Sequence, residues 1–385
     1  MEVTNSIKYI GVNDKDINIF ESQYKVPNGM SYNSYVIMDE KITIMDTVDK
    51  RASNEWIENL EKELGKNEPE YLVISHLEPD HSANIKLLTE KYPNLKLIGN
   101  EMTFKMLPQF FKIENLENRK IVVKESDTIN IGKHTLKFIM APMVHWPEVM
   151  CTYDSFDKVL FTADGFGKFG TLNANEDWTD EARRYYFNIV GKYGMQVQNL
   201  LKKVSNLDVK IICPLHGPIL KENLSYYINK YDTWSSYKPE DEGIFIACSS
   251  IHGNTYKACE ILKEMLETKG AKKVVLSDLT RCDVSKALAN AFRYDKMILA
   301  SSTYNMGLFT PMLNFLNELK GKNYQNRTIG IIENGTWAPS AGKCMNEIVS
   351  TFKDIRIVEP IVTIKTTLND DSKQKLEVLA NNILD

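Results

Sequence analysis

The sequence lacks any pair of cysteines in a Cys-x-x-Cys arrangement. Its six cysteines are scattered over 385 residues. Zinc ribbons, iron–sulfur centres and disulfide frameworks need cysteines at short, regular spacings. We therefore expect none of these centres. We predict that the cysteines are free thiols in a reducing compartment and are buried like other small apolar side chains. They are Cys151, Cys213, Cys248, Cys259, Cys282 and Cys344.

The composition has no surplus of positive charge, and the sequence has no long apolar run. The formal net charge is -4, which leaves no basic excess to bind a phosphate backbone. No stretch approaches the roughly 20 apolar residues of a membrane span. Residues 1–14 lack the charged-then-apolar pattern of a signal peptide. We expect a cytoplasmic protein that binds neither nucleic acid nor membranes.

The length indicates two domains. A single core stops growing at roughly 250 to 300 residues, and this chain has 385. Residues 231–243 lose their periodicity and become polar, with Pro239 and Gly243 as breakers. We place the boundary there, which gives domains 1–240 and 241–385.

Short β-branched runs and helical patterns alternate in the first domain, which predicts an α/β sandwich. The runs lie at 41–48, 70–76, 95–100, 120–125, 135–142, 158–164 and 209–218. The helical patterns lie at 54–66, 82–93 and 175–206.

The second domain alternates strand and helix regularly, which predicts a doubly wound parallel sheet of flavodoxin type. The expected strands are 243–250, 273–279, 296–303, 327–334 and 356–365. The expected helices are 255–270, 283–293, 311–322, 340–353 and 371–384.

Acidic and imidazole side chains follow several predicted strands of the first domain. The strand at 70–76 runs into the sequence HLEPDH, and three more candidates follow later strands. Because strand ends can meet at one edge of a sandwich, these side chains can converge on a metal. The candidates are His76, Glu78, Asp80, His81, His145, Asp164 and His216. By contrast, His134 lies in the turn NIGKHTL, where we expect an exposed hairpin residue.

The sequence HLEPDH resembles the HxHxDH signature of the metallo-β-lactamase fold, with Glu78 at the second histidine position. The HxExDH form, and the later order of His145, Asp164 and His216, are similar to those of flavodiiron proteins. This resemblance extends over nearly the whole chain. It implies an α/β protein with an N-terminal αββα metallo-β-lactamase-like sandwich followed by a flavodoxin-like doubly wound parallel sheet. It also implies two non-heme irons, one held by His76, Glu78 and His145, the other by Asp80, His81 and His216, with Asp164 bridging them.

The ligand set also favours iron on chemical grounds. Four imidazoles and three carboxylates give a site of charge about -3, which suits two Fe(II) better than a histidine-rich zinc site would.

The first strand of the second domain ends in a loop that suits one phosphate. Hydroxyls, Gly253 and the start of a helix occur together there, without the GxGxxG or GxxxxGK pattern of dinucleotide or triphosphate sites. A single phosphate indicates FMN. The predicted contacts are Ser249, Ser250, Ile251, His252, Gly253, Asn254 and Thr255.

Two later strand ends resemble the ring-binding loops of flavodoxins. Small residues there give the flavin room, and an aromatic residue can stack on it. The first loop has Ala300-Ser301-Ser302-Thr303 in place of the commoner GSPT. The predicted ring contacts are Ser302, Thr303, Tyr304, Asn305 and Gly307, followed by Asn334, Gly335, Thr336 and Trp337.

The resemblance implies an electron relay. A rubredoxin-like donor would reduce FMN, FMN would reduce the irons, and the irons would reduce O2 to water or NO to N2O. Asp164 is then a catalytic bridge, and Trp146 and Tyr193 are candidate pocket residues. The resemblance also implies a head-to-tail homodimer or a dimer of such dimers.

Two alternatives stay open. One is a zinc hydrolase fused to a flavodoxin, which the carboxylate of Glu78 disfavours. The other is an electron-transfer or gas-sensing module without catalysis. Within the flavodiiron interpretation we favour O2 over NO, because a composition low in Gly and Pro and rich in Lys, Asn and Ile is typical of anaerobes, which more often need to remove O2.

Overall fold

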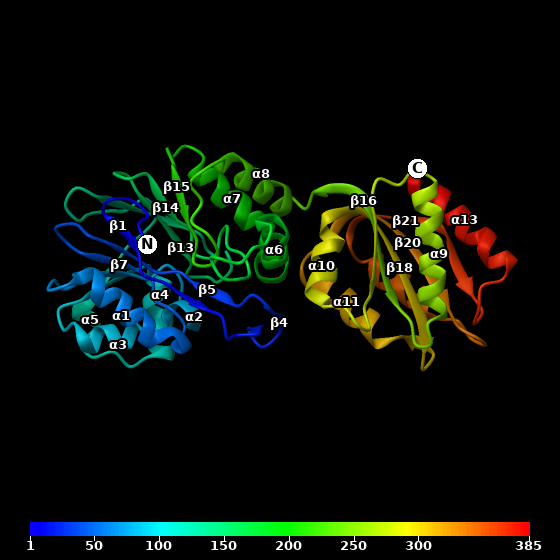
Figure 1. Cartoon of the computed structure of the whole chain (residues 1–385), viewed down its shortest axis with the longest axis horizontal. Helices are drawn as coiled ribbons and strands as arrows, with labels where there is room; N and C mark the ends of the chain where they lie inside the picture. The colour runs from blue at the N-terminus through cyan, green and yellow to red at the C-terminus, as the bar shows by residue number, and fades with distance from the viewer. The chain divides into compact units, whose positions relative to one another are not determined.

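The computed structural model describes residues 1–385, which fall into two compact units. The first unit comprises Met1–Tyr186 and Met195–Asp232, and the second comprises Phe187–Gly194 and Thr233–Asp385. In Figure 1 the first unit runs from blue to green, and most of the second runs from yellow-green to red. None of the helices combines the length and the hydrophobicity that a membrane-spanning segment needs.

Two sheets form the centre of the first unit. One has the order β1-β6-β7-β8-β9-β10 and the other β11-β12-β13-β14-β15. The strands of the first are β1 (Ile7–Tyr9), β6 (Tyr35–Ile37), β7 (Thr43–Met45), β8 (Tyr71–Val73), β9 (Lys96–Gly99) and β10 (Lys120–Val122). Those of the second are β11 (Thr128–Asn130), β12 (Thr135–Met140), β13 (Met150–Asp154), β14 (Val159–Phe161) and β15 (Ile211–Cys213). Two small ribbons pair β2 (Val12–Asp14) with β5 (Met30–Tyr32), and β3 (Ile19–Phe20) with β4 (Tyr24–Lys25).

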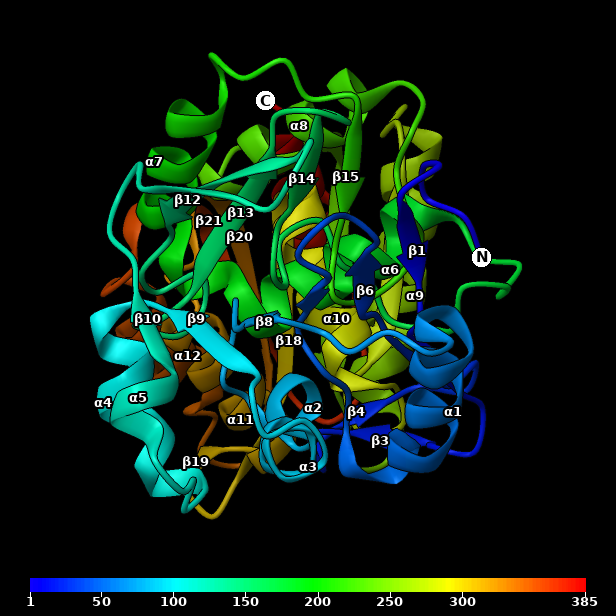
Figure 2. The same cartoon turned by 90° about the vertical axis from the view of Figure 1, so that its left-hand side faces the viewer.

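Helices cover both outer faces of this pair of sheets. Helices α1 to α5 gather on one side, and α7 and α8 lie on the other (Figures 1 and 2). Between the sheets, Tyr35 and Val73 from one sheet share a core cluster with Phe138 and Phe161 from the other. The sequence-based αββα sandwich is therefore confirmed. The helices are η1 (Lys50–Ala52), α1 (Ser53–Leu64), α2 (Pro79–Ser82), α3 (Ile85–Lys91), α4 (Glu101–Phe110), α5 (Leu116–Arg119), α6 (Trp178–Tyr185), α7 (Gly194–Val204) and α8 (Leu224–Ser235).

The second unit holds a parallel sheet with the order β17-β16-β18-β20-β21. Its first strand in the sequence lies inside the sheet, so the chain winds outward in both directions, as the doubly wound prediction requires. The strands are β16 (Asp241–Ser249), β17 (Val274–Asp278), β18 (Tyr294–Tyr304), β20 (Gln325–Asn334) and β21 (Lys353–Ile364), with β19 (Gly307–Leu308) antiparallel to β18. The helices are α9 (Asn254–Thr268), α10 (Val284–Arg293), α11 (Thr310–Gly321), α12 (Ala341–Val349) and α13 (Asp370–Leu384).

A segment from the first half of the sequence belongs to the core of the second unit. It contains most of the π-helix η2 (Tyr186–Val190) and the short helix η3 (Gly191–Tyr193). The ring of Phe187 stacks on Phe292 with centroids 4.1 Å apart. The Asn188 side chain donates to the carbonyl of Ser285 at 3.1 Å. The contacts between residues divide the two units between Asp232 and Thr233. The domain boundary between residues 240 and 241 remains a prediction.

The expectation of an exposed His134 is wrong. Its side chain is 1% exposed. Nδ1 lies 2.9 Å from Asp154 Oδ2, and Nε2 lies 2.9 Å from the Ser6 hydroxyl. The hairpin folds against the β13–β14 turn and the N-terminal segment, so tertiary packing buries a residue that the local sequence places at a surface turn.

Candidate functional site

The loop that follows β8 carries four of the predicted metal ligands. Residues just after β7 hold this loop through hydrogen bonds to its backbone. Asp46, just after β7, accepts hydrogen bonds at Oδ1 from the amides of Ser75 at 2.6 Å and His76 at 3.4 Å. Thr47 donates to the carbonyl of His81 with its amide at 2.9 Å and its hydroxyl at 2.8 Å. The neighbouring strand end therefore fixes both ends of the HLEPDH loop.

The first group of side chains combines two histidines with two carboxylates. Nε2 of His145 lies 3.0 Å from Glu78 Oε2 and 3.1 Å from Asp164 Oδ2. Nε2 of His76 lies 3.1 Å from the same oxygen of Glu78 and 3.4 Å from Asp164 Oδ2. All four side chains therefore point their donor atoms at one place, close enough to hold one metal ion.

The second group adjoins the other oxygen of Asp164. Asp80 Oδ2 lies 3.2 Å from Nε2 of both His81 and His216. Asp164 Oδ1 lies 3.4 Å from His81 Nε2 and 3.8 Å from His216 Nε2. Asp164 thus turns one oxygen to each group, and the structure brings all seven predicted ligands together in two groups with Asp164 between them.

Buried oxygens without donors indicate what these groups can hold. Asp80 Oδ1 and both carboxylate oxygens of Asp164 are buried and accept no hydrogen bond. Burying such oxygens is costly unless a cation compensates their charge. Two imidazoles and hard carboxylate oxygens at each position fit a divalent first-row transition metal such as Fe(II).

The pKa values of the ligand side chains also indicate that this site favours positive charge. Burial opposes charge on every group here, but nearby carboxylates, Asp80 and Asp164 among them, raise the pKa of His81 to about 10. Asp164 and Glu78 likewise raise the pKa of His145 to about 9 against its burial. The pKa of Asp164 is held well below its usual range, because the charge of His76 and the nearby imidazoles of His145 and His81 outweigh its burial. A metal pair would replace these protons.

Two histidines are oriented through their far ring nitrogens. Nδ1 of His76 lies 2.8 Å from Glu148 Oε1, and Nδ1 of His216 lies 2.7 Å from the carbonyl of Ser31. Each acceptor selects the tautomer with the proton on Nδ1, which leaves Nε2 free to bind a metal. Glu148 was not predicted from the sequence, although it lies three residues after His145 in the sequence HWPE.

Aromatic rings surround the two groups. Trp146, one of the predicted pocket residues, packs edge-on against His76 with ring centroids 5.2 Å apart. Tyr193 belongs instead to the second unit, at the end of η3. The fully buried Tyr185, which was not predicted, lies beside the second group, with its ring centroid 5.5 Å from that of His216. Phe20 contacts His216 from the β3–β4 ribbon at the same centroid distance.

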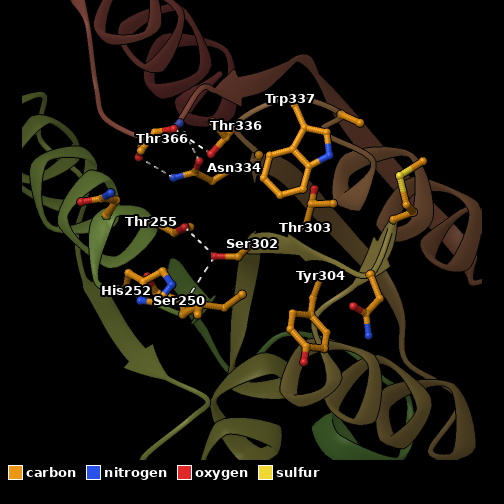
Figure 3. A pocket seen from close by; sticks show the side chains of 16 residues that line it. Ser250, His252, Thr255, Ser302, Thr303, Tyr304, Asn334, Thr336, Trp337 and Thr366 are labelled. Carbon is orange, nitrogen blue, oxygen red and sulfur yellow. Dashed lines mark hydrogen bonds between the residues drawn. The ribbon is translucent and has the colours of Figure 1, made fainter.

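The second unit has a cavity of about 460 Å³ at the carboxyl ends of its strands. One end is polar (Figure 3). There the Ser302 hydroxyl lies 3.0 Å from that of Thr255 and accepts from the amide of Ile251 at 3.4 Å. Gly253 caps α9 with a φ of 89°, and its amide donates to Ser250 Oγ at 3.0 Å. A loop of this kind at a helix N-terminus suits a phosphate.

The other end of the cavity is aromatic. The indole of Trp337 and the ring of Tyr304 lie away from the Ser250–Thr255 end in Figure 3. Trp337 is 87% exposed, which is unusual for so large an apolar side chain and leaves its ring free to stack. Asn334 and Thr366 exchange hydrogen bonds, with Asn334 Nδ2 donating at 3.0 Å and Oδ1 accepting at 3.1 Å.

Most of the predicted flavin contacts line this cavity. Ser249, Gly253 and Gly307 do not, because Ser249 is buried against Ser301, Gly253 caps the helix and Gly307 lies in β19. Thr366 lines the cavity and was missed, since it follows β21 in a stretch without a motif. The predicted residues that line it are Ser250, Ile251, His252, Asn254, Thr255, Ser302, Thr303, Tyr304, Asn305, Asn334, Gly335, Thr336 and Trp337.

The fold and these two sites define a two-part protein, a metallo-β-lactamase-like sandwich with two adjacent groups of potential metal ligands, joined to a flavodoxin-like unit. A family model described as ODP family beta lactamase matches residues 30–217. The anaerobic nitric oxide reductase flavorubredoxin of Vibrio vulnificus is 30% identical over 98% of this chain and 77% of its own length. An uncharacterised protein of Methanocaldococcus jannaschii is 32% identical over 82% of this chain and 80% of its own.

Two solved structures have the same fold over nearly the whole chain. Rubredoxin oxygen:oxidoreductase from Desulfovibrio gigas superposes with a TM-score of 0.91 at 25% identity, over 100% of this chain and 97% of that one. The flavodiiron protein of Giardia intestinalis shares the fold, with a TM-score of 0.89 at 24% identity, over 99% and 95% of the two chains. The chain belongs to the flavodiiron protein family and is an oxidoreductase.

Proposed function

We propose that this protein reduces O2 or NO at two non-heme irons held in the first unit, with electrons delivered through FMN bound in the second. The observation that carries the proposal is Asp164, which turns one carboxylate oxygen to each of two groups that have the same donors. A carboxylate between two adjacent metal positions is the arrangement that a two-metal site needs.

The residues have separate tasks in this proposal. Bound FMN would supply electrons one or two at a time, and a pair of ferrous ions would supply two electrons to a diatomic molecule. His76, Glu78 and His145 would hold one iron, and Asp80, His81 and His216 the other.

The aromatic residues beside the ligands would limit the access of water. Trp146, Tyr185 and Phe20 place rings against the ligand histidines. An apolar wall of this kind admits a small uncharged molecule more readily than an anion, which would lose its hydration shell there. This selectivity fits O2 and NO as substrates.

In the second unit the Ser250–Thr255 loop would bind the FMN phosphate, and the Trp337 indole would stack on the flavin ring. We infer that a separate rubredoxin-like protein supplies the electrons, in a cytoplasmic setting, and that chains pair head to tail as a dimer or a dimer of dimers. The name of the D. gigas protein of similar fold supports both the donor and O2. The name of the V. vulnificus relative supports NO. We keep O2 as the favoured substrate on the composition of the sequence.

The test is made on protein expressed in iron-replete medium. We expect about two irons and one FMN per chain, from two metal groups and one phosphate loop. After anaerobic reduction, separate titration with O2 and NO should reoxidise the flavin over many turnovers, and the ratio of kcat/KM values would give the preference. Zinc without iron would favour the hydrolase alternative, and reoxidation without turnover would favour an electron-transfer or sensing module.

A further inference from the structure

The two metal groups have the same donors but different surroundings. Each contains two histidines and one carboxylate of its own, and both share Asp164. The donors alone therefore give no reason for the two positions to differ in affinity. Any difference must come from the atoms behind the ligands.

In the first group, a carboxylate lies next to the ring nitrogen of His76 that faces away from the metal position. Glu148 Oε1 lies 2.8 Å from His76 Nδ1, and both side chains are fully buried. The same oxygen accepts from the amide of Leu77 at 2.9 Å, and the Glu148 carbonyl accepts from Asn100 Nδ2 at 2.6 Å. A carboxylate held in this way orients the imidazole, makes Nε2 a stronger donor and adds negative charge near the metal.

No carboxylate is hydrogen-bonded to the far ring nitrogens of the histidines in the second group. His216 donates to the neutral carbonyl of Ser31 at 2.7 Å, and His81 Nδ1 is buried without a protein partner. Asp46 lies behind the same loop, but its Oδ1 accepts from the backbone amides of Ser75 and His76 rather than from an imidazole. The ring nitrogens of the second group are therefore supported by less charge.

We propose that Glu148 makes the two metal positions inequivalent, so that the position of His76, Glu78 and His145 binds metal more tightly and fills first. The position of Asp80, His81 and His216 is then the labile one, which fills last and empties first. Glu148 acts through His76 and is a positioning residue. This inference rests on the proposed two-metal function and adds an order of loading to it.

The experiment is a titration of the metal-free, full-length protein with Fe(II) under anaerobic conditions, in competition with a chelator. Wild-type protein should bind two equivalents in two resolved steps. Glu148→Gln keeps the shape but removes the charge, and should weaken the tighter step by about 10- to 100-fold, the usual cost of losing such a partner. Glu148→Asp should restore part of the difference.

The chain offers a matched control in a second buried histidine–carboxylate pair. Asp154 lies 2.9 Å from His134 Nδ1, and both side chains are buried. Asp154→Asn should lower stability but leave both metal-binding steps unchanged. Two equal steps in the wild type, or a Glu148→Gln variant that keeps the tighter step within twofold, would overturn the inference. Binding of fewer than two equivalents by the wild type would instead overturn the two-metal function.

A second measurement needs no variant. With histidine labelled by ¹⁵N, one equivalent of Zn(II), a diamagnetic substitute, should shift the ring signals of His76 and His145 first. The signals of His81 and His216 should move only with the second equivalent. The reverse order, or simultaneous shifts, would refute the assignment of the tighter position.

Discussion

Asp164 serves both metal positions, so its loss should cost more than the loss of a ligand that serves one. Asp164→Ala removes the two buried oxygens that face the two groups and leaves the cations less screened from each other. We expect the purified variant to lose at least one iron per pair while it retains FMN, measured by elemental analysis and flavin absorbance. Full iron occupancy with full turnover would show that Asp164 is not a bridge.

His134 should make the stability of the protein depend on pH. Burial opposes its charge, but the hydrogen bond to Asp154 and the charges of Asp154, Asp157 and Asp39 raise its pKa. Because the folded pKa is the higher one, the stabilisation is complete below the unfolded value of about 6.5 and is lost as pH rises through the folded pKa. Asp154→Asn should therefore cost about 1.5–3 kcal/mol at low pH, and less at high pH.

Urea unfolding of the wild type and Asp154→Asn across this pH range measures the difference. Asp208→Asn is the control, because the Asp208 carboxylate makes only exposed ion pairs, with Lys158 and Lys210. A difference between the wild type and Asp154→Asn that stays constant with pH would show that His134 is not charged in the folded protein.

Glycines at the two ends of helix α9 allow the effect of the phosphate loop on FMN binding to be separated from an effect on helix stability. Gly253 before its N-terminus has φ 89° and Gly270 after its C-terminus has φ 91°, and an added Cβ would meet no atom within 4 Å at either position. Alanine at either glycine should therefore cost a similar strain, about 1–2 kcal/mol for a left-handed residue. Only Gly253→Ala should weaken FMN binding, because strain at this position would displace the amide that donates to Ser250 in the phosphate loop; fluorescence titration measures the affinity. Equal loss of FMN affinity in both variants would remove the phosphate role from this loop.

The elements that the sequence predicts well are those whose pattern is long. All five strands of the parallel sheet were predicted, because runs such as β16 and β20 are nine and ten residues long and mostly buried. Strands β1 to β6, β11 and β13 were not predicted, because polar and turn residues interrupt the β-branched runs around them. Helix α4 was missed as well, because it contains Pro108, which usually breaks a helix.

The residues of the candidate site also fall into those that the sequence predicts and those that it does not. Ligands such as His76 and Asp164 follow strands directly, so position along the sequence predicts them. Glu148 and Tyr185 gain their roles only from the residues that folding places beside them, His76 and His216. No local pattern carries that information.

At the scale of the whole molecule, the second unit depends on Phe187–Gly194. A fragment that begins at Asp241 retains the cavity residues and should bind FMN, but it lacks the Phe187 ring that stacks on Phe292. In the full chain, Phe187→Ala should lower the stability of the FMN-binding unit by about 3–5 kcal/mol, as for other buried Phe residues. The readout is flavin release in urea.

Phe156→Ala is the control, because Phe156 is 54% exposed. A fragment from Asp241 as stable as the unit in the full chain would show that the 187–194 segment contributes nothing to the second core.

The same segment has a consequence for synthesis on the ribosome. Asn188 leaves the ribosome well before its partner Ser285, which lies 97 residues later in the chain. At translation rates of about 5–20 residues per second, this delay lasts roughly 5–20 s. Phe187 lacks the Phe292 ring during that time, although the rest of the first unit is complete by Asp232. The nascent chain therefore passes through a stage in which a folded sandwich carries an unsatisfied apolar segment, a natural binding target for a chaperone.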